Sequence, residues 1–450
     1  MTVPNFPKID ASPTKEFFIS ILSRDVNLSD AISDLVDNSI DGARRLRPNG
    51  DYKGLSIDIE LKETHFQIKD NCGGIPYEIA KDYAFKFGRA TDAPFTEGSI
   101  GKFGVGMKRS FFKMGTGFIV ESTSEHSKFK IDENVESWKT KKDATGKDLW
   151  EFEFKELETN KNFAEPERKT SITVRPLHSA ISEEFKLNNF INRLANFLQS
   201  SHEQAMEQGL EISINEVQLK HKLAQLLVSD KIKPLKKELK FPVDPNKPDP
   251  SVDVEVTIFA GISDANLAAS GWNVICNGRQ VLRADKSRIT GWDESIDGLS
   301  TPKAHYQFSR FRGYVFFESN DAGSLPWNTA KSGIDAESRV YQAAKLDMIG
   351  AMRQVIDFLN KLDSELDSEE TFFQDVIAKA VPTKLMTISS SDRFVYPLPT
   401  SSKPAGPRMT RISFVRPYEE VEFAKEHFSV STAALAGTEA FSYFLAREQE

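Results

Sequence analysis

Two polar side chains on one predicted helix could bind a metal ion and activate a water molecule. Residues 28–47 carry apolar side chains at helical spacing, with Ser29 as the predicted N-cap. Asp34 and Asn38 are four residues apart, so they lie one turn apart on the same face. A carboxylate can take a proton from water, and Mg²⁺ prefers oxygen ligands. Alone, this spacing is more often only a solvated helix face, so its meaning depends on the segments around it.

Two glycine-containing segments further along the chain could surround a nucleotide. Asp70–Gly74 ends a predicted strand, where its carboxylate could accept a hydrogen bond, although such a sequence is usually only a turn. Gly101–Gly106 precedes a helix predicted to begin near residue 105. Its glycines let the backbone approach phosphates closely, and a helix N-terminus attracts anions. The segment is neither a P-loop nor a Rossmann turn after a first strand.

The elements that must position these residues follow from apolar periodicity. Apolar and polar side chains alternate in six predicted strands, at 54–62, 64–70, 117–125, 129–132, 149–155 and 170–176. The simplest assembly is an α+β domain of helices layered on one mixed sheet, ending near residue 205.

A second α+β unit is predicted for residues 206–362. Prolines concentrated in 241–251 mark a loop, and strands are expected at 252–262, 271–282 and 312–319, followed by a long helix at 336–362. Asn277-Gly278 predicts a hairpin turn. The basic residues around that turn could alternatively form a surface strip: Arg279, Arg283, Lys286 and Arg288.

Composition excludes several classes of protein. At about 150 residues per domain, 450 residues suggest about three domains. No apolar run is long enough to span a membrane and the N-terminus lacks signal-peptide features, so we expect a cytoplasmic protein with no membrane partner. Two distant cysteines, Cys72 and Cys276, and dispersed histidines disfavour a disulfide framework or a zinc site.

Charge is unevenly distributed along the chain. The formal net charge of -8 argues against a protein that coats nucleic acid generally. Between Arg393 and Tyr418, however, there are five basic residues and no acidic one. This basic stretch belongs mostly to a predicted linker, 363–409, which leads to a last unit at 410–450.

Taken in order, the motifs resemble the ATP-binding domain of the GHKL superfamily, which includes DNA gyrase B, Hsp90, histidine kinases, MutL and the MORC ATPases. Leu35 to Asp41 resembles the asparagine box, and Asp70 to Gly74 resembles the first glycine box. Gly101 to Gly106 resembles the second glycine box, and Lys169 to Ile172 resembles the last motif. The resemblance implies a Bergerat-type α/β sandwich over residues 1–205, with ATP and Mg²⁺ as cofactors.

The resemblance also implies roles for single residues. Asn38 would bind Mg²⁺ and Asp70 would accept a hydrogen bond from the adenine amino group. Gly74 would leave room for the adenine, and Thr170 would support the contact of Asp70 with it. The remaining cofactor-binding positions fall in a mobile ATP lid at 88–106, namely Gly101, Lys102, Phe103, Gly104, Val105 and Gly106.

Three positions depart from the family pattern. Asp34 stands where hydrolytic members carry a glutamate as general base, and its shorter side chain predicts either slow hydrolysis or hydrolysis that requires lid closure to complete the geometry. Cys72 and Lys169 each replace a glycine of the motifs. The motif therefore does not determine the backbone conformation at Cys72.

The second unit resembles the transducer domain, with a ribosomal-S5-like fold, that follows the ATPase domain of gyrase B, MutL and MORC proteins. Its lysine reaches the γ-phosphate of the neighbouring site, and Lys331 lies in the loop before the long helix, where that lysine is expected. We therefore name Lys331 with Asp34 as catalytic; the alternative is an exposed loop lysine.

Residues 410–450 resemble a ribbon-helix-helix unit, with one strand and two helices. The strand of that fold pairs with a second copy, which predicts a homodimer. Such ribbons often read DNA, and here Arg411, Ser413 and Val415 would point outward. Dimerisation, contact with duplex DNA and a simple packing appendage are the three alternatives.

The resemblance to prokaryotic MORC/MutL-like and Hsp90-like ATPases implies a Mg-dependent ATPase whose nucleotide gates dimerisation. It also implies a DNA-directed role in an anti-phage defence or restriction-associated system. No nuclease motif is recognisable in the sequence, so any cutting would need a nuclease or other effector encoded nearby. The alternatives are an Hsp90-like protein-remodelling chaperone and an ATP-binding regulator with little turnover.

Overall fold

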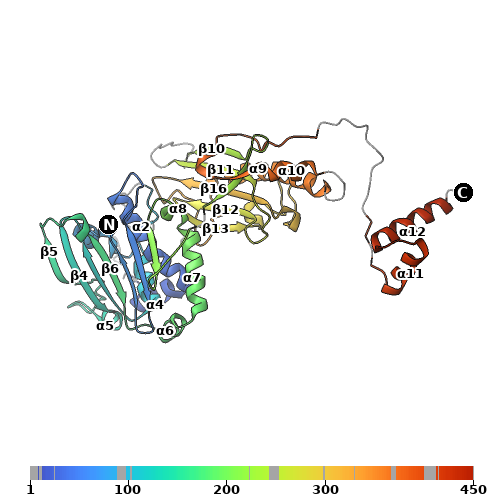
Figure 1. The fold of residues 1–450 in the computed structure, drawn as a ribbon. Coiled ribbons are helices and arrows are strands. Elements are labelled where there is room, and N and C mark those ends of the chain that lie inside the picture. Colours follow the sequence, from blue (N-terminus) through green and yellow to red (C-terminus); the bar gives the residue numbers. More distant parts are fainter. Residues whose placement is uncertain are drawn as a thin grey trace, which may run out of the picture. The chain divides into compact units, whose positions relative to one another are not determined.

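The fold is described from a computed structural model of the chain, which is divided into two units (Figure 1). The structure describes residues 9, 13–24, 26–88, 98–101, 104–221, 223–242, 253–296, 299–328, 330–365, 371–399, 412–413 and 415–448. The first unit contains residues 1–363 and 372–397, and the second contains 364–371 and 398–450. One continuous apolar core runs through both large sheets of the first unit.

The N-terminal sheet has eight strands in the order β5-β4-β3-β6-β2-β1-β7-β8. Side chains of β1 and β4 alternate between buried and more exposed positions, as the period of two requires when helices cover one face. All pairs are antiparallel except β1 with β7. The strands are β1 (Ser56–Leu61), β2 (Phe66–Asp70), β3 (Gly117–Thr123), β4 (Ser127–Asn134), β5 (Phe154–Thr159), β6 (Lys169–Val174), β7 (Glu211–Ile214) and β8 (Val217–Gln218).

Helices α2, α4 and α7 gather beside this sheet (Figure 1). Ile32, Leu35 and Val36 of α2 are buried in the shared core, so the helix is fixed by its apolar side. The helices of this part are α1 (Lys15–Arg24), α2 (Leu28–Leu46), α3 (Tyr77–Ile79), α4 (Gly106–Met114), α5 (Val135–Thr140), α6 (Ser179–Phe185), α7 (Asn188–Ser201) and α8 (Glu203–Glu207).

A second sheet has five strands in the order β10-β11-β16-β12-β13. The long helix α9 (Arg339–Glu365) shares its core, with Tyr341, Met348 and Met352 fully buried. The strands are β10 (Leu235–Phe241), β11 (Val254–Ile262), β12 (Gly271–Cys276), β13 (Arg279–Asp285) and β16 (Phe311–Glu318). Two small ladders pair β9 (Gln225–Val228) with β17 (Val381–Lys384) and β14 (Ser295–Ile296) with β15 (Leu299–Ser300).

The sequence places the main elements correctly and some of their ends incorrectly. The predicted strand at 149–155 is shifted, because β5 begins at Phe154. The N-cap of α2 is Asn27, whose side chain accepts a hydrogen bond from the backbone N–H of Asp30, and not Ser29. The predicted hairpin at Asn277-Gly278 is confirmed, with Cys276 opposite Arg279.

Two predicted boundaries are wrong. The N-terminal sheet does not end near 205, because β7 adds to β1 in parallel and the sheet continues to Gln218. Residues 372–397, expected to be linker, pack in the first unit through α10 (Phe372–Ala378) and β17. Phe373, Val376 and Phe394 are buried there, which ties this segment to the core.

The second unit contains the helix pair α11 (Tyr418–Phe428) and α12 (Ala433–Glu448). Residues 412, 413, 415 and 416, the described part of the predicted ribbon and its flank, are not in a strand, and Arg411 lies outside the described residues. Phe423 is 71% exposed, and Phe441, Tyr443 and Phe444 are each about half exposed. Among helices in the described ranges, none is long and apolar enough to cross a bilayer.

Candidate active site on helix α2

Asp34 is buried at the centre of a cluster of charges. Its Oδ2 forms an ion pair with Arg109 of α4, and its Oδ1 lies 3.4 Å from the Nζ of Lys331. Gly106, the first residue of α4, is close to the same carboxylate: a Cβ there would lie 3.2 Å from Asp34 Oδ2. The absence of a side chain at Gly106 therefore lets the N-terminus of α4 approach Asp34.

Asp37 is a site residue that the sequence reasoning missed. Its side chain is fully buried, and its Oδ2 accepts a hydrogen bond of 2.8 Å from Lys331. Burial alone would raise the pKa of Asp37, but the nearby charges of Lys331 and Arg279 lower it to about 2. Conversely, burial opposes the charge of Lys331, but Asp37 and Asp34 raise its pKa above the usual value. Both partners are therefore ionised at neutral pH.

Arg279 and His202 complete the network around Asp37. Both lie 3.7 Å from Asp37 Oδ1, and His202 Nε2 lies 2.9 Å from a guanidinium nitrogen of Arg279. Since a guanidinium only donates, Nε2 accepts and the ring proton is assigned to Nδ1, on the side of Asp37. Burial and the charge of Arg279 lower the pKa of His202 to about 3, so the ring is neutral.

The position of Arg279 corrects the alternative of a basic surface strip. Its side chain is 2% exposed, hydrogen-bonds to Ser33 and lies over the ring of Phe197. Arg283 and Arg288 are exposed, as the strip required. The strip therefore lacks the arginine nearest the hairpin turn, because buried acids of α2 attract that residue inward.

Asn38, the predicted Mg²⁺ ligand, is exposed between two buried neighbours of α2. Its Oδ1 lies 4.0 Å from where a Cβ of Gly101 would be. The carboxylate of Asp41 accepts hydrogen bonds of 2.8 Å from the backbone N–H groups of Ile100 and Gly101. Helix α2 thus holds the start of the second glycine segment beside Asn38; Lys102 and Phe103 lie outside the described residues.

The rest of the second glycine segment leads into α4. Gly104 has φ 65°, in the region that favours glycine, and Val105 is the N-cap of α4 without a capping side chain. Lys108 is buried and donates to the backbone carbonyls of Ala84 and Gly104. Burial lowers the pKa of Lys108 to about 7. This lysine therefore holds the glycine segment by a backbone contact.

Asp70 lies at the end of β2 and contacts α2 through Ser39. It accepts hydrogen bonds from Ser39 Oγ at 2.7 Å and from the backbone N–H of Cys72 at 2.9 Å. Its strand neighbour on β6 is Thr170, which is buried. Burial raises the pKa of the Asp70 carboxyl, and the hydrogen bond from Ser39 partly offsets this. Asp70 and Thr170 are thus adjacent, as the resemblance implies.

The first glycine box requires glycine for a steric reason. Gly74 has φ 70°, and a Cβ on it would lie 2.0 Å from the carbonyl oxygen of Thr123 in β3. Cys72, which replaces a glycine of the motif, is buried, and its carbonyl packs against Gly42 of α2. The absence of a side chain at Gly42 therefore leaves room for cysteine, in place of glycine, at position 72.

The residues fit a magnesium nucleotide. An exposed carboxamide at Asn38 suits a hard cation, and the start of α4 has its N–H groups free of a capping side chain. Among the described residues, no group of three His, Cys, Asp or Glu could hold a metal without further ligands. A cation at Asn38 would therefore depend on oxygens of the nucleotide and water.

Comparison with known proteins agrees with this geometry. Residues 26–164 match the family model described as histidine kinase-, DNA gyrase B-, and HSP90-like ATPase. A search of curated proteins finds no match to the chain. The matched range contains Asp34, Asn38, Asp70 and the second glycine segment, whereas Lys331 lies beyond it. This match, together with the mixed α+β fold of helices on one large sheet, supports a GHKL-type ATPase domain over residues 26–164.

Proposed function

We propose that the chain binds ATP with Mg²⁺ and hydrolyses it slowly, and that within a dimer of two copies the nucleotide brings the two ATP-binding domains together. The observation that carries this proposal is the contact of Lys331 with Asp34 and Asp37. Lys331 comes from the loop before α9, nearly three hundred residues along the chain from α2. A buried cation beside the candidate base is the arrangement that phosphoryl transfer needs for its developing charge.

Each residue has a chemical task in this proposal. Bound Mg-ATP supplies the phosphoryl group, with the metal neutralising its charge. Asn38 holds the cation, Asp70 accepts a hydrogen bond from the adenine of ATP, and Lys331 neutralises negative charge near α2. Asp34 orients a water molecule and takes its proton. A carboxylate has about four lone-pair sites, so Asp34 can accept a hydrogen bond from water in addition to its contacts with Arg109 and Lys331.

Asp70→Asn tests nucleotide binding. We expect the Kd for ATP to rise about 10- to 100-fold, because a hydrogen bond to a charged acceptor contributes about 1.5–3 kcal/mol. Calorimetric titration with ATP and Mg²⁺ measures this. Asp58→Asn is the matched control, since Asp58 on β1 also accepts a serine hydroxyl, Ser213 Oγ at 2.7 Å. Equal affinities for the two variants would contradict the role of Asp70.

Dimerisation is supported by the second unit. Its two helices contact each other, yet among the described residues of α11 and α12 only Ala436 is buried. Two helices alone cannot bury enough apolar surface to be stable in water. Four exposed aromatic rings, on Phe423, Phe441, Tyr443 and Phe444, supply an apolar surface that a second copy would cover.

A DNA-directed role is the finer part of the proposal, and a defence or restriction setting goes with it. It is supported by the stretch from Arg393 to Tyr418, which has five basic residues and no acidic one. Such a stretch would contact phosphates and give an affinity that falls with salt. A nuclease or other effector would then supply any cutting activity.

A chain ending at Pro397 tests both proposals for the C-terminal part. We expect the full chain without nucleotide to have about twice 50.6 kDa by light scattering, and to bind duplex DNA with a salt-dependent affinity. The shortened chain should be monomeric and lose most DNA binding, while its Kd for ATP stays the same because the first unit is complete. A monomeric full chain would refute dimerisation, and unchanged DNA binding would refute the basic stretch as its site.

A further inference from the structure

A hairpin turn of the second sheet contacts the glycine segment of the ATPase domain. Asn277 lies in the turn between β12 and β13, is 5% exposed and has φ 46°. Its Nδ2 donates to the carbonyl of Ser99 at 3.0 Å and to the carbonyl of Ser319 at 2.9 Å. Its Oδ1 accepts from the backbone N–H of Ser319 at 3.0 Å. One carboxamide therefore joins three segments that are distant in sequence.

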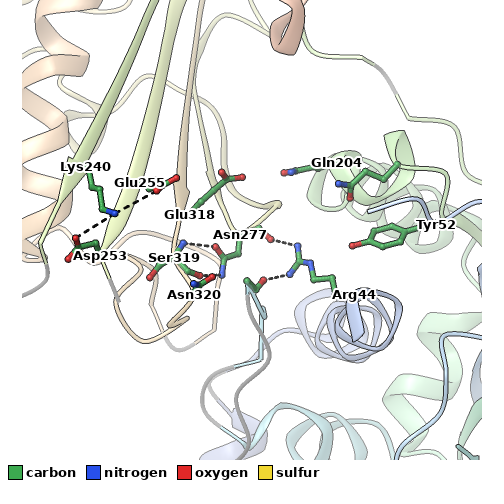
Figure 2. A pocket seen from close by; sticks show the side chains of 12 residues that line it. Arg44, Tyr52, Gln204, Lys240, Asp253, Glu255, Asn277, Glu318, Ser319 and Asn320 are labelled. Atoms are coloured by element: carbon green, nitrogen blue, oxygen red, sulfur yellow. Dashed lines mark hydrogen bonds and ion pairs between the residues drawn. The ribbon is translucent and has the colours of Figure 1, made fainter. Parts of the chain in front are cut away.

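Arg44 of α2 strengthens this junction from the other side. Its guanidinium donates to the carbonyl of Asn277 at 2.6 Å and to the carbonyl of Gly98 (Figure 2). The segment Gly98–Gly101 is thus held by Arg44, Asp41 and Asn277 together. These contacts hold the residues that precede the second glycine segment, Gly98 to Ile100, at a fixed position against the hairpin turn of the second sheet.

Ser319 begins the loop that carries Lys331, and that loop is internally braced. Asp321 accepts hydrogen bonds from Gly323 and Ser324, and the indole of Trp327 donates to the carbonyl of Ala322 at 3.0 Å. Further along, the backbone N–H of Lys331 donates to the carbonyl of Asn328 at 3.0 Å. A displacement of Ser319 would therefore be transmitted to Lys331.

We propose that Asn277 is a positioning residue, which fixes the glycine segment at Ser99 and the Lys331 loop at Ser319 in one frame. Misplacement of a catalytic group by about 1 Å can lower a rate by about a hundredfold. Asn277 therefore acts through Lys331 and not on the nucleotide. The inference rests on the proposed ATPase function and names a residue through which the second sheet controls it.

Asn277→Gly is the variant that tests this, because glycine accepts φ 46° and only the carboxamide is lost. The side chain lies beside a cavity of about 340 Å³ lined also by Arg44 and Ser319, so water can enter the space that it leaves (Figure 2). We expect kcat for ATP to fall about 10- to 100-fold, with the Kd for ATP within threefold of the original. Asn277→Asp, which replaces the donor by an acceptor facing two carbonyls, should lower kcat at least as much.

The matched control is Asn215→Gly, in the turn between β7 and β8. Asn215 has φ 47°, and its Oδ1 accepts from the backbone N–H of Leu61 at 2.9 Å. Asn215→Gly should leave kcat within twofold while lowering the melting temperature comparably. If Asn277 only stabilises a turn, its replacement should behave as that of Asn215 does.

A double substitution with Lys331→Met separates positioning from a general effect. Asn277→Gly should lower kcat in the original chain and change it less than twofold in the Lys331→Met chain. Equal reductions in both backgrounds, or an unchanged kcat in the original chain, would overturn the proposal.

A readout that needs no turnover keeps the inference separate from the proposed function. Hydrogen exchange at the backbone amides of Ile100 and Gly101 and at Lys331 should accelerate together in Asn277→Gly and not in Asn215→Gly. If the original chain does not hydrolyse ATP, the proposed function fails, and the exchange result still decides on Asn277. Acceleration confined to the β12–β13 turn would overturn the positioning role.

Discussion

Replacing Asp34 by Asn is expected to lower kcat for ATP at least a hundredfold, while the Kd for ATP changes less than threefold. A positioned general base contributes about 10²–10⁴ to a rate, and the amide cannot take the proton. The substitution preserves shape, so the close contact with Gly106 at the start of α4 is kept. Phosphate release measured with saturating ATP gives kcat, and a titration with ATP and Mg²⁺ gives the Kd.

Asp30→Asn is the control for Asp34→Asn. Asp30 lies one turn earlier on α2, is also buried and accepts a hydrogen bond of 2.6 Å from Asn27. Its loss of charge should leave kcat within about threefold, because its hydrogen bonds join it to Asn27, whereas Arg279, Asp34 and Arg109 act on it only through longer-range charge. If Asp34→Asn retained full turnover, Asp34 would not be the base. If neither the original chain nor its variants turned over ATP, a binding regulator would be the better description.

The part of the site formed by local sequence is predictable from the sequence. Asp34 and Asn38 are placed by helical periodicity, and Asp70 by the end of a strand whose alternation is clear. Two glycines of the boxes have a local cause as well, since positive φ is needed at Gly74 and Gly104. The close approaches of Gly74 to Thr123 and of Gly106 to Asp34 join distant segments, and the sequence shows them only through the motif.

The part of the site formed between distant segments could not be predicted in this way. Asp37 was passed over because a single acid on a helix is most simply solvated, yet it is fully buried beside Lys331 and Arg279. One signal was available: Asp37 follows Asp34 by three residues and precedes Asp41 by four, so several acids gather on one side of the helix. Two buried acids require cations from elsewhere.

Errors at Arg279 and at residues 372–397 have the same origin. Arg279 follows a hairpin turn, where arginine is usually exposed, and only the acids of another element explain its burial. The segment 372–397 is apolar at 13 of its 26 positions, and it packs because β17 pairs with β9 across more than a hundred residues. Its apolar content was a signal for packing, but local composition does not identify the partner.

Lys331→Met is the second substitution for which we expect a large effect, because it separates catalysis from stability. Methionine keeps the length and apolar stem of lysine but removes the cation, so kcat should fall at least a hundredfold. Asp37 would keep Arg279 and lose its closest partner, and breaking a buried ion pair costs about 3–5 kcal/mol of unfolding free energy. Chemical denaturation of the two chains measures this loss.

Adding Asp37→Asn to Lys331→Met should recover part of the stability, because the uncompensated buried carboxylate is removed, but none of the turnover. Lys345→Met is the control, since Lys345 forms a 2.7 Å ion pair with Glu294 that lies away from α2; its kcat should be unchanged. Recovery of both stability and turnover in the double variant would mean that Lys331 only neutralises Asp37. A loss of stability without a loss of turnover in Lys331→Met would lead to the same conclusion, and Lys331 would then be a structural residue of the domain junction.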